Sequence, residues 1–431
     1  MSKADLSTTG GADRIHVLVA HPGAELYGSD QQVVRSVEAF CAVGWRVTVA
    51  LPERGALCTE LGDVTVTAIA SPVLRRAWLR PLGLVRLVAQ TPLAILRQVR
   101  MIRALRPDVV FVNTVTLPHW VLAARLARCR VVVHAHEAEE GVSRGLRAAL
   151  YLPLLLAHRV IANSDTTRRV IAAAAARLRS RIRVVFNGVA DPGAQPTTAS
   201  VPGRLTVVSR LSPRKGVHDA IETLRLLVAA GRDLTLEVCG TVFAGYEWYE
   251  AELRETVRAA GLDDRVIFAG FVSPIEHALA RAEIVLAPSY GESFGNSVVE
   301  AMLAERPVVA SAVQGLAEVV DHRRTGMLTP AGDAAAVAEV VAQLLDDPEQ
   351  ARRIAFRARQ EARSRFATER YGRALTDAVL EVLEGTNRGK PQGFLKSEQI
   401  VAQDISSDAK FAMLNSYRRP GARPALRVVG R

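Results

Sequence analysis

The sequence predicts an α/β fold in which two doubly wound domains face each other across a cleft. The chain has 431 residues, which exceeds one ordinary domain and suits two. Short β-branched runs alternate with longer stretches of helical spacing, as in a parallel sheet covered by helices. A segment rich in Pro, Gly, Ser and Thr, residues 191–203, separates two such series and is predicted to be a linker.

The first domain, residues 14–190, is predicted from its buried strands. These are expected at Ile15–His21, Trp45–Pro52, Asp108–Asn113, Arg130–His136, Arg159–Asn163 and Ile182–Phe186, with a helix at Gln31–Val43. The sequences of such strands are continuous apolar runs because helices cover both faces of the sheet. In an open sheet of this kind, ligands bind at the carboxyl ends of the strands.

The second domain, residues 204–384, repeats the alternation. Its strands are expected at Leu205–Ser209, Leu234–Cys239, Val266–Phe268, Ile284–Ala287 and Val308–Ala310. Its helices are expected at Val217–Ala230, Tyr249–Ala260, Glu276–Ala282, Ser297–Ala304 and Ala334–Leu345, and Pro348–Glu384 is expected to be helical and to close this domain. Residues 385–431 show no stable period, so we expect a flexible basic tail.

The net charge of +11 is unevenly distributed. Residues 1–190 carry a net +12, residues 191–384 a net −7 and residues 385–431 a net +6. An even basic charge is typical of soluble proteins or of nucleic-acid binding, whereas this asymmetry favours docking on an anionic membrane or on a phosphorylated acceptor. Aromatic residues make up only 5% of the chain, which argues against stacking on single strands. We therefore expect no nucleic-acid partner.

The cysteines and the apolar runs bear on the cellular compartment. The four cysteines, Cys41, Cys58, Cys129 and Cys239, lack the spacing of a zinc site and are expected to be reduced core thiols. The N-terminus shows no apolar signal segment, and the longest apolar run has ten residues where a spanning helix needs about 20. A cytoplasmic protein, peripheral at the inner face of the plasma membrane, is expected.

The segment Ala287–Ala301, APSYGESFGNSVVEA, carries the strongest chemical signal. A strand ends in a turn, Gly295 lets a ligand approach the backbone, and the helix starting near Ser297 offers free N–H groups to an anion. Glu292 in the loop and Glu300 one turn inside the helix can accept hydrogen bonds from hydroxyl groups. Phosphate between two sets of hydroxyls is the pattern of a sugar nucleotide, whereas the alternative is a capped surface helix with two solvated carboxylates.

A second turn, Ser209–Gly216 or SRLSPRKG, follows the first strand of the second domain. Arg210, Arg214 and Lys215 lie where a diphosphate would bind, since Arg clamps phosphate oxygens and Lys adds a point charge. The alternative is an ordinary basic surface turn. The two acidic positions at the same sheet edge favour the phosphate interpretation.

Other nucleotide motifs are missing from the sequence. The P-loop pattern G-x-x-x-x-G-K-[ST] does not occur, and the first strand-to-helix turn, HPGAELYGSD, does not spell G-x-G-x-x-G. The D-x-D motif that carries a metal in many sugar-nucleotide enzymes does not occur either. We expect no catalytic metal and no cofactor beyond the nucleotide sugar itself.

Together these residues resemble the family 4 retaining glycosyltransferases. The resemblance rests on Glu292-x7-Glu300 with Phe294-Gly295, on the Arg210…Lys215-Gly216 turn, and on Phe186-Asn187-Gly188-Val189 before the linker. It covers roughly residues 14–384 and implies the GT-B fold, with two Rossmann-like domains, the first binding the acceptor and the second the nucleotide sugar. A UDP- or GDP-type donor is implied.

The resemblance also implies roles for single residues. Arg210 and Lys215 would hold the donor diphosphate, Glu300 the ribose hydroxyls, and Glu292 with the amides of Phe294, Gly295 and Asn296 the donor sugar. Gly28, in Tyr27-Gly28-Ser29-Asp30 where the family often has Gly-Gly-Ala-Glu, would close on the phosphates. His136, chosen over His134 because it lies later in its turn, would lie beside the reacting sugar unless it is a core or capping histidine. The segment Gln314–Glu318 keeps only Gly315 and Glu318 of a family pattern.

The implied reaction moves a hexose to a glycan or lipid-linked acceptor, in polysaccharide, glycolipid or cell-envelope biosynthesis. The resemblance implies retention at the anomeric carbon without a clear protein nucleophile, because the acceptor hydroxyl would attack on the side that the diphosphate leaves. Two alternatives share the fold class: a nucleotide-sugar 2-epimerase and a non-catalytic sugar-nucleotide binder.

Residues 71–106 form a basic segment that favours membrane contact. The segment holds eight arginines, no Asp or Glu, and many Leu, Val and Ile residues, with Trp78 among the first arginines. Such a stretch can lie on anionic lipid. The alternative is a helix packed on the sheet through Leu93, Leu96, Val99 and Ile102, with a solvated basic face.

Overall fold

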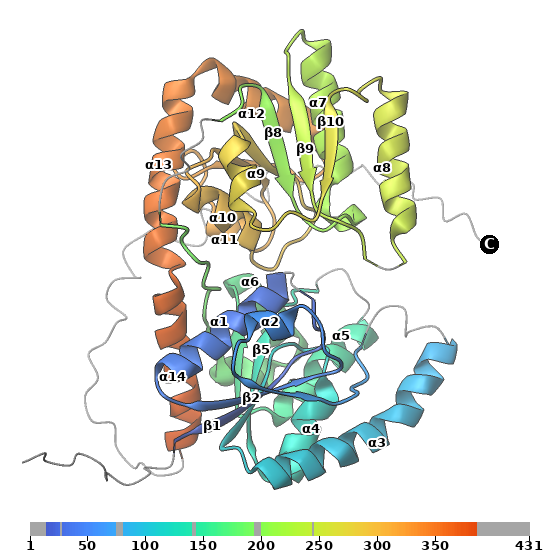
Figure 1. The fold of residues 1–431 in the computed structure, drawn as a ribbon, viewed down its shortest axis with the longest axis vertical. Coiled ribbons are helices and arrows are strands. Elements are labelled where there is room, and N and C mark those ends of the chain that lie inside the picture. Colours follow the sequence, from blue (N-terminus) through green and yellow to red (C-terminus); the bar gives the residue numbers. More distant parts are fainter. Residues whose placement is uncertain are drawn as a thin grey trace, which may run out of the picture. The chain divides into compact units, whose positions relative to one another are not determined.

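The computed structural model describes residues 14–25, 28–74, 81–139, 144–193, 200–243 and 245–385. The N-terminal half of the chain forms one parallel sheet and the C-terminal half forms a second, and helices cover both faces of each sheet (Figure 1). The predicted positions Tyr27, Arg75, Arg76, Trp78 and Arg80 lie outside the described residues. Of the predicted tail, 385–431, only Gly385 is described.

The first sheet is parallel, with seven strands among the described residues in the order β3-β2-β1-β4-β5-β6-β7. The strands are β1 (His16–Ala20), β2 (Arg46–Leu51), β3 (Thr65–Ala68), β4 (Val109–Val112), β5 (Arg130–Ala135), β6 (Arg159–Ala162) and β7 (Ile182–Val184). The strand order reverses direction between β1 and β4, which is where such a sheet opens a binding crevice. The short strand β3, which is only half-buried, was not predicted from the sequence.

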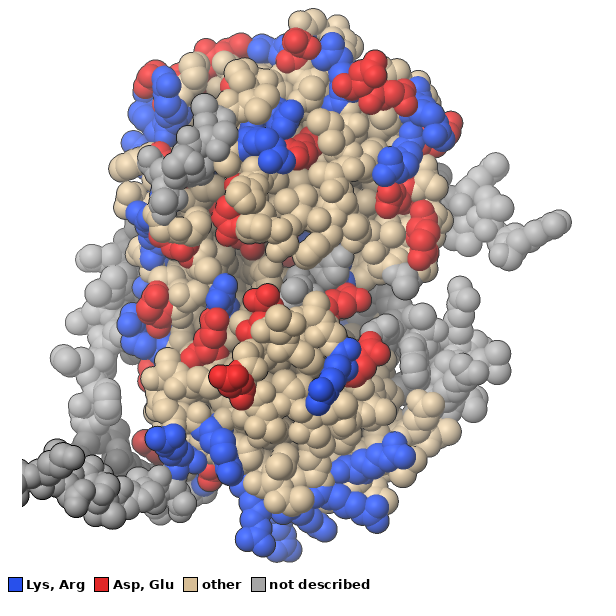
Figure 2. All heavy atoms as spheres, viewed as in Figure 1, with Lys and Arg blue, Asp and Glu red and all other residues tan. Residues whose placement is uncertain are grey.

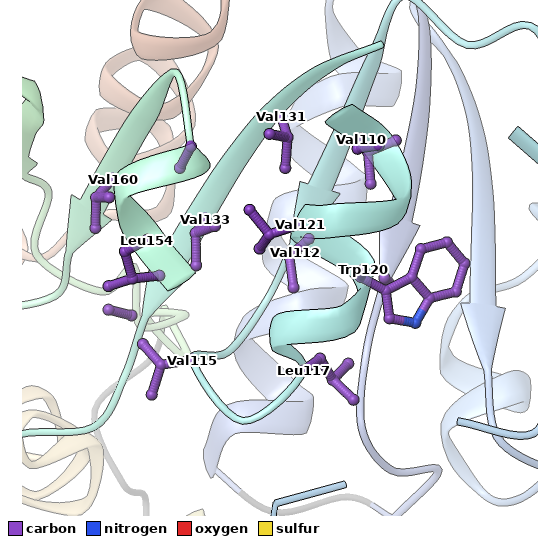
Figure 3. Packing of buried hydrophobic residues seen from close by; sticks show 14 of the residues in the cluster. Val110, Val112, Val115, Leu117, Trp120, Val121, Val131, Val133, Leu154 and Val160 are labelled. Carbon is purple, nitrogen blue, oxygen red and sulfur yellow. The ribbon is translucent and has the colours of Figure 1, made fainter. Parts of the chain in front are cut away.

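Helices cover both faces of the first sheet. They are α1 (Gly28–Ala42), α2 (Leu57–Glu60), α3 (Pro81–Leu105), α4 (Pro118–Leu126), α5 (Arg144–Tyr151), α6 (Asp165–Ala174) and the 3-10 turns η2 (Leu152–Leu156) and η3 (Ala176–Arg181). On one face, valines of β4 and β5 pack against Trp120 and Val121 of α4 and Leu154 of η2 (Figure 3). The Trp120 indole N–H donates to Ser71 Oγ at 3.2 Å, so the polar edge of this core residue is satisfied.

The second sheet is also parallel, in the order β10-β9-β8-β11-β12-β13 over the described residues. Its strands are β8 (Arg204–Val208), β9 (Thr235–Cys239), β10 (Val266–Gly270), β11 (Ile284–Ala287), β12 (Val308–Ser311) and β13 (Met327–Thr329). The strand order reverses between β8 and β11, the two strands that precede the predicted phosphate and sugar loops. The three-residue strand β13 was not predicted.

The helices of the second half, apart from the last one, divide between the two faces of that sheet. They are η4 (Pro213–Lys215), α7 (Val217–Ala229), α8 (Glu247–Ala259), α9 (Glu276–Arg281), α10 (Asn296–Leu303), α11 (Leu316–Val319), α12 (Ala334–Asp346), α13 (Pro348–Arg365) and α14 (Thr368–Glu384). One hydrophobic cluster joins the sheet to α7, α8 and α12, and another joins it to α9, α10 and α11. Figure 1 shows α8 and α9 on opposite sides of β8 and β9.

The stretch predicted as one closing helical region, Pro348–Glu384, is two helices that serve different halves. α13 packs on α10 and α12 of the second half. α14 packs on α1, β5 and β6 of the first half, where Tyr371, Leu375 and Val379 join the core around β1 (Figure 1). The Tyr371 hydroxyl shares a 2.6 Å hydrogen bond with Ser36. The last helix therefore completes the first half, although the sequence analysis assigned it to the second domain.

The predicted basic segment is helical over Pro81–Leu105, and its apolar residues divide between core and surface. Val99 and Ile102 are buried, as the packing alternative requires. Leu93 and Leu96 are 49% and 45% exposed, contrary to that alternative. Lys and Arg side chains gather on the surface over α3 and α4 (Figure 2).

Two further expectations concern thiols and membrane spans. All four cysteines are free, but only Cys239 is buried, and Cys41 is exposed at the end of α1. The prediction of four core thiols was therefore wrong for Cys41. Among the described residues, no helix combines the length and the apolar character needed to cross a bilayer.

Candidate functional site

The turn after β8 and the loop after β11 interlock through their backbones. Gly216, with φ +67°, begins α7, and a Cβ there would lie 2.0 Å from the carbonyl oxygen of Pro288. Tyr290 N donates to Arg214 O at 2.8 Å, and Arg214 Nε donates to Gly291 O at 2.8 Å. The two predicted loops are therefore held together by backbone contacts, and position 216, where they touch, requires glycine.

Lys215 and Glu292 meet where these loops join. The Lys215 ammonium donates to a Glu292 carboxylate oxygen. A small pocket lies beside this pair, lined by Ser209 after β8, Ser289 and Glu292 after β11, Ser297 of α10 and others. Three residues predicted for the donor site, Lys215, Glu292 and Ser297, thus line one pocket at the edge of the second sheet.

The N-terminus of α10 is shaped by Gly295 and Phe294. Gly295 has φ +105°, and a Cβ there would lie 2.5 Å from Leu316 Cδ2. The Phe294 side chain is buried and packs edge-on against Phe366, so only its backbone is available to a ligand. The predicted use of the amides at Phe294–Asn296 by a ligand stays a prediction.

Asn296 connects three parts of the chain. Its side-chain oxygen accepts from Asn187 Nδ2 at 2.9 Å, and its Nδ2 donates to Gly28 O at 3.4 Å. A Cβ on Gly28 would lie 3.7 Å from Asn296 Nδ2, an ordinary contact. The described residues therefore leave room for a side chain at Gly28, so a requirement for glycine there would come from a bound ligand.

Glu300 is a half-buried carboxyl on α10. Burial and, to a lesser extent, the negative charge of Glu276 raise the pKa of Glu300 to about 7, although Arg35 opposes the shift. Its protonation therefore changes near neutral pH. A carboxyl of this kind accepts hydroxyl hydrogen bonds best once it is ionised.

The arginines of the β8–α7 turn pair with carboxylates of the first half. Arg210 Nη2 lies 3.2 Å from Glu25 Oε2 and 3.9 Å from Asp30 Oδ2. Arg214 Nη1 lies 3.3 Å from Glu139 Oε1. An anion that binds these guanidinium groups competes with the three carboxylates, so the first half sets part of the anion affinity of the second.

His136 belongs to a buried hydrogen-bonded chain. His136 Nε2 lies 3.0 Å from Asn113 Oδ1, Asn113 Nδ2 lies 3.1 Å from His21 Nδ1, and His21 Nε2 lies 2.7 Å from Asp30 Oδ1. Because the amide oxygen only accepts and the amide nitrogen only donates, each Nε2 carries the proton. The chain His136–Asn113–His21–Asp30 thus reaches Arg210 of the second half.

The two histidines of this segment differ in burial, since His134 is buried and His136 is half-buried. Burial and, to a lesser extent, His21 lower the pKa of His136 to about 3, although Asp30 opposes the shift, so the ring is neutral at physiological pH. His134 is fully buried against Phe111 and Tyr371, and burial lowers its pKa as well. Its ring lies 4.0 Å behind that of His136, so His134 supports His136 from inside the core.

Glu318 connects the second half to the start of α6 in the first. Its carboxylate accepts from Asp165 N and Thr166 N, both at 2.7 Å, and from the Thr166 hydroxyl at 2.6 Å. Gln314 Nε2 donates to Ala138 O at 3.2 Å from the same segment. The Glu318 carboxylate therefore lies at the N-terminus of α6, where the helix dipole favours a negative charge.

His21, Asn113 and Asp30 were missed as a network by the sequence analysis. His21 follows β1 and Asn113 follows β4, and these strands flank the reversal of strand order in the first sheet. Polar residues directly after two strands at that position were the available signal. Within the described residues, no group of three or more His, Cys, Asp or Glu side chains is arranged to hold a metal ion.

Comparison with known families agrees with this geometry. Residues 28–191 match the family model described as Glycosyltransferase Family 4, and residues 197–361 match the one described as glycosyl transferases group 1. The chain belongs to the group 1, family 4 glycosyltransferases. The two matched ranges of this family meet at the predicted linker.

Individual glycosyltransferases resemble parts of the chain. The 2-deoxystreptamine glucosyltransferase of Streptomyces kanamyceticus is 37% identical over 143 residues, 33% of this chain and 36% of that protein. The lipopolysaccharide core mannosyltransferase LpcC of Rhizobium leguminosarum bv. viciae is 33% identical over 190 residues, 44% of this chain and 54% of that protein. The chain thus spans about a third to a half of the length of these relatives.

Among solved structures, Anabaena HepE in complex with UDP and glucose matches with a TM-score of 0.73. The match covers 85% of this chain and all of that one at 23% sequence identity, so the likeness is one of fold. The fold of this glycosyltransferase family member is GT-B, as the sequence predicted.

Proposed function

We propose that the protein is a retaining hexosyltransferase that moves a sugar from a nucleoside-diphosphate sugar to a hydroxyl of a glycan or lipid-linked acceptor. The observation that carries the proposal is the meeting of Lys215 and Glu292 at one pocket, which is also lined by Ser297 of α10 and by Ser209, the residue before Arg210. Cations suit the diphosphate, and a carboxylate with free amides suits sugar hydroxyls. The family membership supports this class of reaction.

The proposed chemistry follows from charge. Negative charge develops on the departing diphosphate, and Arg210, Lys215 and the first amides of α10 are donors fixed in advance for it. The acceptor hydroxyl attacks the anomeric carbon on the face that the diphosphate leaves, and a phosphate oxygen takes its proton. The sequence contains no D-x-D motif, so we propose that these cations carry out the role of a divalent metal.

The proposed donor carries UDP or GDP. HepE has been solved with UDP-glucose, and its fold is that of this chain, which makes a UDP-sugar the first donor to test. Glu300 would accept the ribose hydroxyls. His136, neutral and held by Asn113, would lie beside the transferred sugar with its unprotonated Nδ1 available as an acceptor.

The test is transfer and hydrolysis with UDP-glucose, UDP-galactose, GDP-mannose and ADP-glucose. We expect turnover with a UDP- or GDP-sugar, and at least a 100-fold lower rate in Lys215→Ala and Glu292→Ala, since removing one preorganised polar group from such a site costs about 10²–10³ in rate. Arg357→Ala and Glu339→Ala, exposed on α13 and α12 of the same half, are the matched controls. Unchanged rates in the first pair would refute the site, and an epimerised sugar nucleotide would indicate the epimerase instead.

We also propose peripheral contact with an anionic membrane through the segment 71–106 and its neighbours. Leu93 and Leu96 of α3 and Leu126 of α4 are exposed beside Arg97 and Arg100, and neither helix contains Asp or Glu. Apolar side chains flanked by arginines suit a lipid surface. Cosedimentation with phosphatidylglycerol vesicles at low salt should be lost in a Leu93→Ser/Leu96→Ser variant, and absence of binding by the unaltered protein would refute this contact.

A further inference from the structure

A series of rings in mutual contact crosses the edge of the second sheet on the side of α7 and α8. This aromatic ladder comprises Phe243, Tyr246, Trp248, Tyr249, His218 and Tyr290. The centroids of successive rings are 5.7–6.3 Å apart. Two pairs, Tyr246–Trp248 and His218–Tyr290, are stacked with interplanar angles of 29° and 18°.

The ladder is anchored inside and open outside. Tyr249 is buried, and its hydroxyl lies 2.9 Å from His218 Nδ1. Trp248 is 54% exposed and Tyr290 46% exposed. Only 22 of the 431 residues are aromatic, and four of the six exposed aromatic side chains in the described part of the chain belong to the ladder. Exposed aromatic faces gathered in this way mark a binding surface.

Both ends of the ladder contact the turn proposed to hold the diphosphate. At one end, the Arg210 guanidinium lies 4.2 Å from the centroid of the Phe243 ring. At the other, Tyr290 N donates to Arg214 O at 2.8 Å, and the ring of Tyr290 stacks on His218 of α7. The ladder therefore continues directly from the reaction site.

The position of Glu300 decides between two ligands that stack on aromatic rings, a nucleobase and a sugar. Glu300 lies on α10, which packs with α9 and α11 on one face of the second sheet. The ladder rests on α7 and α8, which pack on the other face. If Glu300 holds the ribose, as the proposed function has it, the nucleoside lies on the α9–α10 side and the ladder is left for another ligand.

We propose that the aromatic ladder binds the sugar rings of a neutral glycan acceptor chain beyond the sugar that reacts. The aromatic faces pack against the C–H faces of sugar rings, while the Tyr hydroxyls and the Trp248 indole N–H can bond to sugar hydroxyls. The inference rests on the proposed function, and it makes a glycan chain, rather than a lipid alone, the acceptor class.

The experiment measures binding of four neutral hexasaccharides, maltohexaose, cellohexaose, chitohexaose and mannohexaose, by titration calorimetry with the full chain at saturating UDP. We expect at least one to bind, and its Kd to rise about tenfold in Trp248→Ala and in Tyr246→Ala, as for an exposed aromatic contact at the centre of an interface. Phe356→Ala is the matched control, because Phe356 on α13 is also 54% exposed but lies outside the ladder.

The UDP affinity of each variant separates the outcomes. Unchanged UDP binding with weakened hexasaccharide binding supports the ladder as a glycan site. A parallel loss of UDP affinity in Trp248→Ala would show that the ladder stacks the nucleobase, which overturns the inference. Failure of all four hexasaccharides to bind, or equal effects of Phe356→Ala, would overturn it while UDP-sugar turnover still stands. Loss of UDP binding in the unaltered protein would instead contradict the proposed function.

Discussion

The two sheets place their functional residues at equivalent points but by different means. In each sheet the strand order reverses once, between β1 and β4 and between β8 and β11, and the candidate residues follow these strands. At the second edge, glycine backbones interlock: an added Cβ at Gly216 or Gly315 would lie 2.0 or 2.3 Å from a carbonyl oxygen. At the first edge, the chain from His136 to Asp30 is built from side chains.

This difference teaches how each half can vary. In the second sheet, the interlocked loop backbones hold their amide groups in place for a phosphate group that every donor shares. Substitution of the glycines at these contacts distorts the loop itself. A side-chain network can change with its residues while the sheet persists. Substitutions in the loops of the second sheet should therefore mainly destabilise the fold. Substitutions in the side-chain network of the first sheet should mainly lower activity while the protein stays folded.

The largest expected effect comes from adding a methyl group at a glycine where the two loops of the second sheet touch. Gly216→Ala forces a clash with Pro288 O at a residue with φ +67°, so we expect a loss of about 2–4 kcal/mol in the free energy of unfolding. Gly28→Ala, whose Cβ meets only Asn296 Nδ2 at 3.7 Å, should keep its stability within about 0.5 kcal/mol and lose UDP affinity. Urea denaturation and UDP titration measure both, and equal stability losses would remove the contrast.

The next effect tests the side-chain network. Asn113→Ala leaves His136 Nε2 and His21 Nδ1 without their shared partner, so we expect a loss of about 2 kcal/mol in stability and a lower kcat at unchanged UDP affinity. Asn113→Asp still accepts from His136 and should lose less kcat than the alanine variant. A larger fall in UDP affinity than in kcat would place the network on the donor side instead.

A third prediction uses the raised pKa of Glu300. The pKa of Glu300 is about 7 in the folded protein and 4.5 in the unfolded chain, so the folded protein holds this proton more tightly. The free energy of unfolding therefore falls as the pH rises from about 4.5 to above 7. Glu300→Gln should therefore be more stable than the unaltered protein at pH 8 by at least about 1 kcal/mol, and equal to it near pH 4.5.

The same carboxyl should set the pH dependence of nucleotide binding. UDP affinity should rise between pH 6 and pH 8 in the unaltered protein by more than in Glu300→Gln, since only the ionised carboxylate is a pure acceptor. Titration calorimetry of both proteins over this pH range measures the difference, because the ionisation of UDP affects the two proteins equally. Identical profiles would remove Glu300 from the ribose site.

The smallest effect concerns the carboxylates that face the arginines. Glu25→Gln removes a competitor from Arg210, so UDP affinity should rise about two- to fivefold at low salt, and the gain should shrink at 0.5 M NaCl. Glu60→Gln, an exposed carboxyl on α2, is the control. A lower UDP affinity in Glu25→Gln would mean that Glu25 orients Arg210 rather than competing for it.

Much of the fold could be predicted from the sequence because parallel buried strands leave apolar runs. All six strands expected in the first half are present, and β3 was missed because its Thr and Val residues are only half-buried. The pair Glu292 and Lys215 could be predicted because both lie in short loops after strands. The assignment of α14 was wrong since helical periodicity shows that a face is buried and not which sheet buries it.

The rest of the site depends on contacts between distant segments. Asn113 and His21 are 92 residues apart, and Glu318 meets Thr166 across 152 residues. No local pattern records such a pair. The aromatic ladder was hidden for the same reason, because Tyr290 and Trp248 come from different loops and meet only through His218 and Tyr249.

The return of α14 to the first sheet affects how the protein is made on the ribosome. Tyr371, Leu375 and Val379 complete the core around β1, yet they are synthesised after the whole second half. At about 5–20 residues per second, the roughly 190 residues that follow the first half take on the order of 10–40 s to synthesise. During that interval one face of the nascent first half lacks its cover, so chaperone binding to this nascent chain should concentrate on α1 and β1 and end once residue 384 has emerged.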